Sequence, residues 1–153
     1  MTSTPESIPP TTELLAVEFE TLETSIKIDR LVPDLVSVQQ ELVAVTKDAQ
    51  NPQYRSKYAT LTACLDVAIP ALTAHGFALV QAGGIGPTGA VLVSTTILHT
   101  SGQWMRTTLP MRPTERGDSN QALGSALSYG RRYGLSLLLA LRQNDDDANA
   151  SDG

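Results

Sequence analysis

The sequence has few of the residues from which covalent and metal-bound frameworks are made. Its 153 residues include one cysteine, Cys64, and two histidines, His75 and His99. A single cysteine excludes an internal disulfide framework. Together with two isolated histidines it forms neither a metal site nor a nucleophilic catalytic centre. We therefore expect a protein that is not an enzyme and that uses no metal or other cofactor.

Long apolar runs and targeting signals are also missing. No stretch approaches the roughly 20 apolar residues that a membrane-spanning helix needs. Residues 1–10 have neither the basic nor the apolar region of a secretory signal. Since 41% of the residues are hydrophobic, we expect one cytoplasmic domain with a core of ordinary size.

Charge is divided unevenly along the chain, whose net charge is -5. Residues 1–34 hold seven acidic and two basic residues, and residues 143–153 hold four aspartates and no base. Residues 35–142 hold nine basic and five acidic residues, a net charge of +4. We therefore divide the chain into an acidic, partly disordered N-terminal segment (1–34), a basic core (35–142) and an acidic, disordered tail (143–153). A basic middle suggests a polyanionic partner, although an ordinary surface with solvated tails has the same charges.

Apolar residues at helical spacing predict three helices before the first strand. The first is weak and acidic and uses Leu15, Phe19, Leu22 and Ile26. Pro33 interrupts the pattern, and a second helix follows over about 35–48. A third helix covers about 59–75, where Gly76 should end it and Pro70 should kink or divide it.

Three strands should follow, over 77–82, 90–99 and 103–109, because these segments are short, apolar or β-branched, or alternate in polarity. Residues 83–88 would form the first connection, and Thr100-Ser101-Gly102 would form a tight hairpin. The fold class is therefore α+β, an antiparallel β-meander packed against helices.

Residues 119–134 form a predicted helix with two different faces, and the apolar tract 135–141 either extends it or forms a short buried segment. The face expected to point to the core consists of Ala122, Leu123, Ala126, Leu127, Tyr129, Gly130, Tyr133 and Gly134. The second face is small and polar and comprises Gln121, Ser125, Ser128 and Arg132, with Gly124 and Arg131 at its edge. Hydroxyl, amide and guanidinium groups bind phosphates, and small side chains let another backbone approach. The alternative is a merely solvated face, but glycine and serine lower helix propensity there.

Aromatic and basic residues alternate in the segment 51–58, where Tyr54 and Tyr58 flank Arg55 and Lys57. Proteins hold single strands in this sequence-tolerant way, stacking bases on rings and binding phosphates with cations. Alternatively, Tyr58 anchors the segment in the core beside solvated charges.

Two other classes of function stay open. A metal-dependent nuclease could use the run Asp145, Asp146 and Asp147, although such sites draw carboxylates from separate rigid elements. A structural or interaction module could instead bind the acidic ends of its neighbours with its basic surface.

Several of these segments, in this order, resemble the ERF (essential recombination function) family of phage single-strand annealing proteins. The resemblance covers about residues 51–149 and is carried by NPQYRSKYATL, ILHTSGQWMRTTLP, QALGSALSYGRRYGLSLLLAL and DDDAN. It implies a β-meander packed on helices, similar to the eukaryotic annealing protein that loads recombinases. It also implies ring or arc homo-oligomers that bind single-stranded DNA and anneal complementary strands without ATP, in the host cytoplasm and with phage or host recombination proteins as partners.

The predicted DNA-binding residues are the basic, polar and aromatic side chains of this middle region. They are Arg55, Lys57, Tyr58, Arg106, Arg112, Arg116, Gln121, Ser125, Ser128, Arg131 and Arg132.

Overall fold

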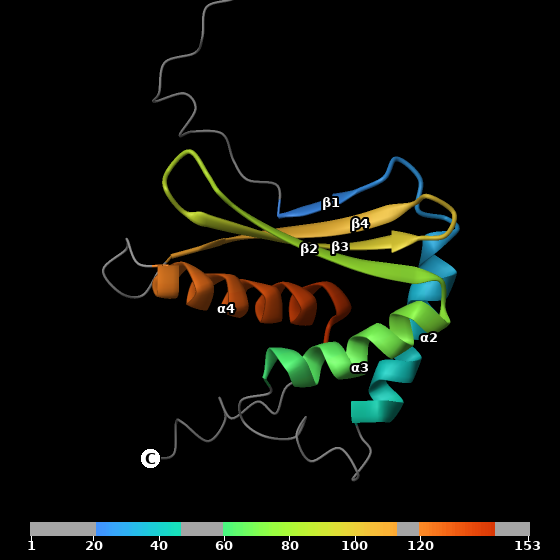
Figure 1. Cartoon of the computed structure of the whole chain (residues 1–153). Helices are drawn as coiled ribbons and strands as arrows, with labels where there is room; N and C mark the ends of the chain where they lie inside the picture. The colour runs from blue at the N-terminus through green and yellow to red at the C-terminus, as the bar shows by residue number, and fades with distance from the viewer. Residues whose placement is uncertain (1–20, 47–59, 113–119, 143–153) are drawn as a thin grey trace, which may run out of the picture.

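The computed structural model describes residues 21–46, 60–112 and 120–142, which form an α+β fold of two layers. The elements are β1 (Leu22–Thr24), α2 (Leu31–Thr46), α3 (Leu61–Ala74), β2 (Phe77–Ile85), β3 (Val91–His99), β4 (Trp104–Met111) and α4 (Asn120–Leu139). The strands make one antiparallel sheet in the order β1-β4-β3-β2. In Figure 1, α4 runs beneath the sheet, α3 lies beneath the sheet near the C-terminal end of α4, and α2 lies at one end of the sheet. The predicted meander of antiparallel strands on helices is confirmed.

The three predicted strands are present, but β2 is longer than expected. It continues through Gly83 and Gly84 to Ile85, because these residues pair with β3 up to Val91. The prediction of a loop beginning at residue 83 was therefore wrong. The tight hairpin after β3 is confirmed, since the Gly102 N–H donates to the His99 carbonyl (2.9 Å) and Gly102 has a φ of +90°.

The predicted first helix is wrong at its C-terminal end, where residues 22–24 form the edge strand β1. These residues pair with the backbone along the edge of β4, and the Thr108 N–H donates to the Thr21 carbonyl (3.1 Å). Leu22 and Ile26, half of the apolar pattern, are exposed. With so little apolar surface to bury, sheet pairing prevails over the weak helical periodicity. Leu15 and Phe19 lie outside the described residues.

The second helix, α2, begins at Leu31, earlier than predicted, and contains Pro33 in its first turn. Proline is tolerated there because the first N–H groups of a helix have no partner within it. The N–H of Leu31 and that of Arg30, just before the helix, both donate to Oε1 of Gln103 (2.9 Å each). The Gln103 amide also donates to Asp29 (2.9 Å), and this hydrogen bond lowers the pKa of that carboxyl.

A histidine fastens the same end of the sheet to α2. Nδ1 of His99 accepts from the backbone N–H (3.2 Å) of Ser101 and lies 2.7 Å from its hydroxyl. A ring nitrogen that accepts a backbone N–H carries no proton, so Nε2 is the donor to Oδ2 of Asp34 at 2.6 Å. The His99 side chain is only 6% exposed. Ser101, His99 and Asp34 therefore form a chain of hydrogen bonds that links the hairpin to the first turn of α2.

The third helix ends as the sequence indicates. Thr60 caps α3 by accepting the Ala63 N–H (3.1 Å), and Gly76, with a φ of +79°, follows the C-cap His75. Pro70 lies inside the helix on its exposed side and does not divide it.

The apolar tract after residue 134 extends α4, which settles the two possibilities left open above. Leu135 and Leu139 are buried in the main core, where α2 and α3 contribute most of the other side chains. The helix ends at Leu139. Ala140 follows with a φ of +52°, and the Leu141 N–H donates to the Ser136 carbonyl (3.0 Å). This turn returns Leu141 to the core.

Two glycines set the distance between α4 and the sheet. A Cβ on Gly130 would lie 2.5 Å from Cγ2 of Val93, and one on Gly134 would lie 2.5 Å from Oγ1 of Thr95. The helix therefore packs closely against the Val93 and Thr95 side chains of β3. Tyr129 and Tyr133, which were expected to face the core, are 49% and 41% exposed. That prediction was wrong because the sheet-facing line of α4 runs along Gly130 and Gly134, and each tyrosine lies about 100° away from it around the helix.

Substitution by alanine should change the stability of the protein in opposite directions at Gly130 and at Gly124 of α4. Gly130→Ala should lower the free energy of unfolding by about 1–3 kcal/mol, because the new methyl group collides with the stiff side chain of Val93. Gly124→Ala should raise it by up to about 1 kcal/mol, since alanine favours the helix and nothing lies within 4 Å of the new Cβ. Urea unfolding of both variants measures the difference. Equal effects would contradict the packing described here.

Candidate nucleic-acid interface

The small, polar face of α4 is open. We define it as Gln121, Gly124, Ser125 and Ser128, followed by Arg131 and Arg132. All six are exposed except Arg132, which is half-buried. Their exposure agrees with a face of α4 that points away from the core, and their role in DNA binding stays a prediction.

The same side of α4 changes character along the helix. At about 100° per residue, Leu135 and Leu139 continue the line of Ser128 and Arg132. These leucines pack against the buried residues of α3, which include Cys64 and Leu72. Thus α3 covers this side of α4 over its C-terminal half, and among the described residues its N-terminal half has no such cover.

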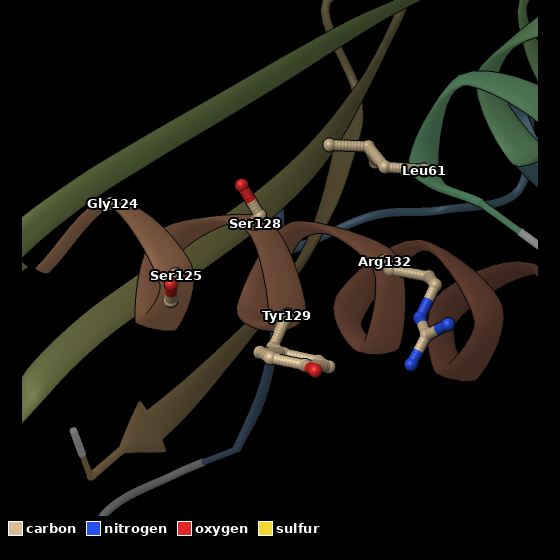
Figure 2. Close-up of a pocket in the computed structure, with 6 residues that line it drawn as sticks. All are labelled: Leu61, Gly124, Ser125, Ser128, Tyr129 and Arg132. Carbon is tan, nitrogen blue, oxygen red and sulfur yellow. The ribbon is translucent and has the colours of Figure 1, made fainter. Parts of the chain in front are cut away.

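Hollows flank the small polar face on both sides. The first, drawn in Figure 2, is lined by Leu61 of α3 and by Gly124, Ser125, Ser128, Tyr129 and Arg132. The second is lined by Gln81, Ala82, Gly83, Val93, Gly124, Leu127, Ser128 and Arg131. The two hollows share Gly124 and Ser128, and each has one of the two arginines. The neighbouring arginines therefore serve different sides of the same helix.

Arg131 is held by a residue that the sequence analysis did not select. Nε of Arg131 donates to Oε1 of Gln81 (3.1 Å), and Nε2 of Gln81 donates to the Arg131 carbonyl (2.9 Å) and to Oγ1 of Thr95 (3.0 Å). Gln81 belongs to β2 and lies opposite Thr95 in the register. The sequence does hold a signal for this role: Gln81 is a polar residue two positions after Leu79, and alternation along a strand places both on the inward face.

Arg132 lies against the exposed tyrosines. Its Cζ is 5.5 Å from the ring centroid of Tyr129 and 5.1 Å from that of Tyr133. The two rings are stacked, with centroids 6.1 Å apart and planes 22° apart. The Arg132 charge also acts on Cys64 in the core. Burial raises the pKa of the Cys64 thiol, and the positive charge of Arg132 partly opposes this shift. A thiol that is buried and kept protonated is a poor nucleophile.

The sequence model of the ERF superfamily matches residues 32–153. The chain belongs to the ERF superfamily. No curated protein and no solved structure matches it. The family match thus confirms the resemblance drawn from the sequence motifs, while the likeness to the eukaryotic annealing fold stays a prediction.

The other predicted site residues of this ERF protein are not gathered at the small polar face. Arg106 lies on the opposite side of the sheet, because it alternates with Thr107, which packs toward α4. There its Nε donates to Thr96 (2.9 Å) and its Cζ lies 4.9 Å from the ring centroid of Trp104. Arg112 is exposed just after β4. The remaining four predictions, Arg55, Lys57, Tyr58 and Arg116, lie outside the described residues.

No metal-binding cluster was found in the described part of this ERF protein: residues 21–46, 60–112 and 120–142 contain no group of three or more His, Cys, Asp or Glu side chains. The aspartate run 145–147 lies outside these ranges. None of the helices described is long and apolar enough to cross a membrane.

Gln81 should support both the fold and the position of Arg131. Gln81→Ala removes three hydrogen bonds between β2, β3 and α4, and it should lower the free energy of unfolding by about 1–3 kcal/mol. The Arg131 Nε–H should also exchange faster with solvent in NMR spectra, because its acceptor is gone. Gln40→Ala, which changes an exposed glutamine of α2, is the matched control. Unchanged stability and exchange in Gln81→Ala would show that these bonds do not hold Arg131.

Proposed function

We propose that this ERF protein binds single-stranded DNA along the small polar face of α4 and anneals complementary strands without ATP. Membership in the superfamily supports a general role in recombination and annealing. The observation that carries the proposal is the open face itself, with small polar residues in the middle and an arginine in the hollow on each side.

The side chains suit a DNA backbone. Gly124 has no side chain, and Ser125 and Ser128 have short ones, so a strand can approach the helix closely. Serine hydroxyls donate to phosphate oxygens, and guanidinium groups bind them with two hydrogen bonds. Contacts to the backbone fix a strand without reading its sequence. Annealing requires this, because base edges must stay free to find their complements.

Three of the predicted DNA-binding residues shortly precede α3 in the sequence. Leu61 lines the first hollow, and Tyr58 precedes it by three residues, a span of at most about 11 Å. Lys57 and Arg55 precede Tyr58 by one and three residues. We propose that these three side chains extend the binding surface, whereas Arg106 would contact only DNA that passes the other side of the sheet.

Assembly into a homo-oligomeric ring or arc would multiply the contacts of one subunit. Few phosphate contacts per subunit give weak binding, but linked sites act at high effective concentration. The acidic residues 1–34 and the basic residues 35–142 could attract each other between neighbouring subunits. Sedimentation with and without a single-stranded oligonucleotide should therefore show species well above one chain. A species of 16.3 kDa alone, at micromolar protein, would contradict assembly.

The two arginines provide the direct test. Arg131→Ala and Arg132→Ala should each weaken binding to single strands of any sequence, and each should reduce the slope of log K against log salt by roughly 0.7. The double variant should lose both contacts and anneal more slowly. Arg142→Ala, which removes an exposed charge beyond the end of α4, should leave the slope unchanged.

The outcome separates the classes of function. Unchanged affinity, slope and annealing rate in the double variant would show that α4 is not the DNA surface. An incubation of labelled DNA with magnesium, with and without a chelator, tests the nuclease alternative: metal-dependent cleavage would favour it. Absence of any DNA binding would favour the interaction module.

A further inference from the structure

Two exposed tyrosines on α4 have no role in the core. Tyr129 and Tyr133 are 49% and 41% exposed and lie one turn apart. Large aromatic side chains are usually buried because they remove much apolar surface from water. In α4, Gly130 and Gly134 occupy the positions that contact β3, and both tyrosine rings lie at the margin of the buried surface. Tyr129 also lines the first hollow, beside the small polar face (Figure 2).

The rings are ordered rather than loosely exposed. They stack at 6.1 Å with an angle of 22° between planes. The Arg132 guanidinium lies 5.5 and 5.1 Å from the two ring centroids, within the range of cation–π attraction. A positive charge and an aromatic face are therefore presented together. Figure 2 shows the Tyr129 ring and the Arg132 guanidinium projecting from the same side of α4.

We propose that Tyr129, supported by Tyr133 and Arg132, is a stacking platform for unpaired nucleobases. This inference rests on the proposed binding of single-stranded DNA and adds how the site recognises it. A phosphate held by Arg132 would place the base of the same or the next nucleotide within reach of the Tyr129 ring. Stacking on aromatic rings tolerates every base, because each base has a π face. It therefore agrees with contacts that do not read the sequence.

The platform would also make the site selective for single strands. In a duplex each base already stacks on its neighbours, so no face is free for a tyrosine. A base that leaves Tyr129 to pair with a complement loses its contact with the protein. Annealing would then weaken the hold on the product and release it.

An oligonucleotide without bases isolates this contribution. Wild-type protein is titrated with a thymidine 20-mer and with an abasic 20-mer of equal phosphate number. Wild type should bind the thymidine strand more tightly. Tyr129→Ala should weaken binding of the thymidine strand roughly 5- to 100-fold per stacked base, and it should leave the abasic strand and the salt slope unchanged. Tyr129→Phe, which keeps the ring, should bind both strands as wild type does.

Two further variants control for packing. Tyr129→Leu keeps a large apolar side chain but has no π face. It should therefore lose the preference for the thymidine strand, and it serves as the test if Tyr129→Ala folds poorly. Leu137→Ala removes an exposed side chain, 65% accessible, about two turns beyond Tyr129 on the same helix. It should bind both oligonucleotides as wild type does.

The possible failures are distinguishable. If Tyr129→Ala and Tyr129→Leu bind both strands as wild type does, or weaken both equally, the stacking platform is refuted while DNA binding stands. If these variants change the sedimenting mass of the DNA-free protein but not the preference for bases, the tyrosines form an interface between copies, and the proposal is wrong. If wild type binds neither strand, the proposed function itself fails.

Discussion

The contact between α4 and β3 through Gly130 and Gly134 is the constraint on which the rest of the described fold depends. Without a Cβ at either position, the helix lies close against Val93 and Thr95. The strip of α4 that this contact buries runs along the two glycines, and Tyr129 and Tyr133 lie about 100° away from it around the helix. Larger residues on either side of the strip then point away from the sheet. Packing of the core thus decides which side chains of α4 are left for solvent or a ligand.

The close approach also determines where the two arginines go. Arg131 lies on the flank near β2, within hydrogen-bonding distance of Gln81 (3.1 Å), and Arg132 lies on the flank near the exposed tyrosines. Toward the C-terminus of α4, α3 covers the side of the helix that carries Leu135 and Leu139. One helix therefore completes the core with its C-terminal half and presents a polar surface with its N-terminal half. Because both halves belong to one rigid element, the core fixes the geometry of the surface.

The sequence predicted most of this architecture, and its errors share a physical cause. Periodicity identified α3, the meander and the small polar face, because burial patterns along one element are local. It failed where another element decides the outcome. The edge of β4 draws residues 22–24 into the sheet. The contact of Gly130 and Gly134 with β3 fixes which side of α4 faces the sheet and leaves Tyr129 and Tyr133 exposed. Gln81 was missed for the same reason, since its partners Thr95 and Arg131 are distant in sequence. A helical projection gives the order of residues around α4, but not how wide a strip its neighbours bury.

A protein that anneals strands must hold DNA and also let it go, and the described site suits this combination. The proposed contacts are few per subunit and mostly to phosphates, which remain present in the duplex. Phosphate contacts alone would therefore hold product as well as substrate. Stacking differs, because a base that pairs gives up its contact with a tyrosine. If both operate on α4, the arginines supply affinity for any strand, and the tyrosines make that affinity decrease as pairing proceeds. The free energy of base pairing could then drive release, which explains how such a protein would complete the reaction without ATP.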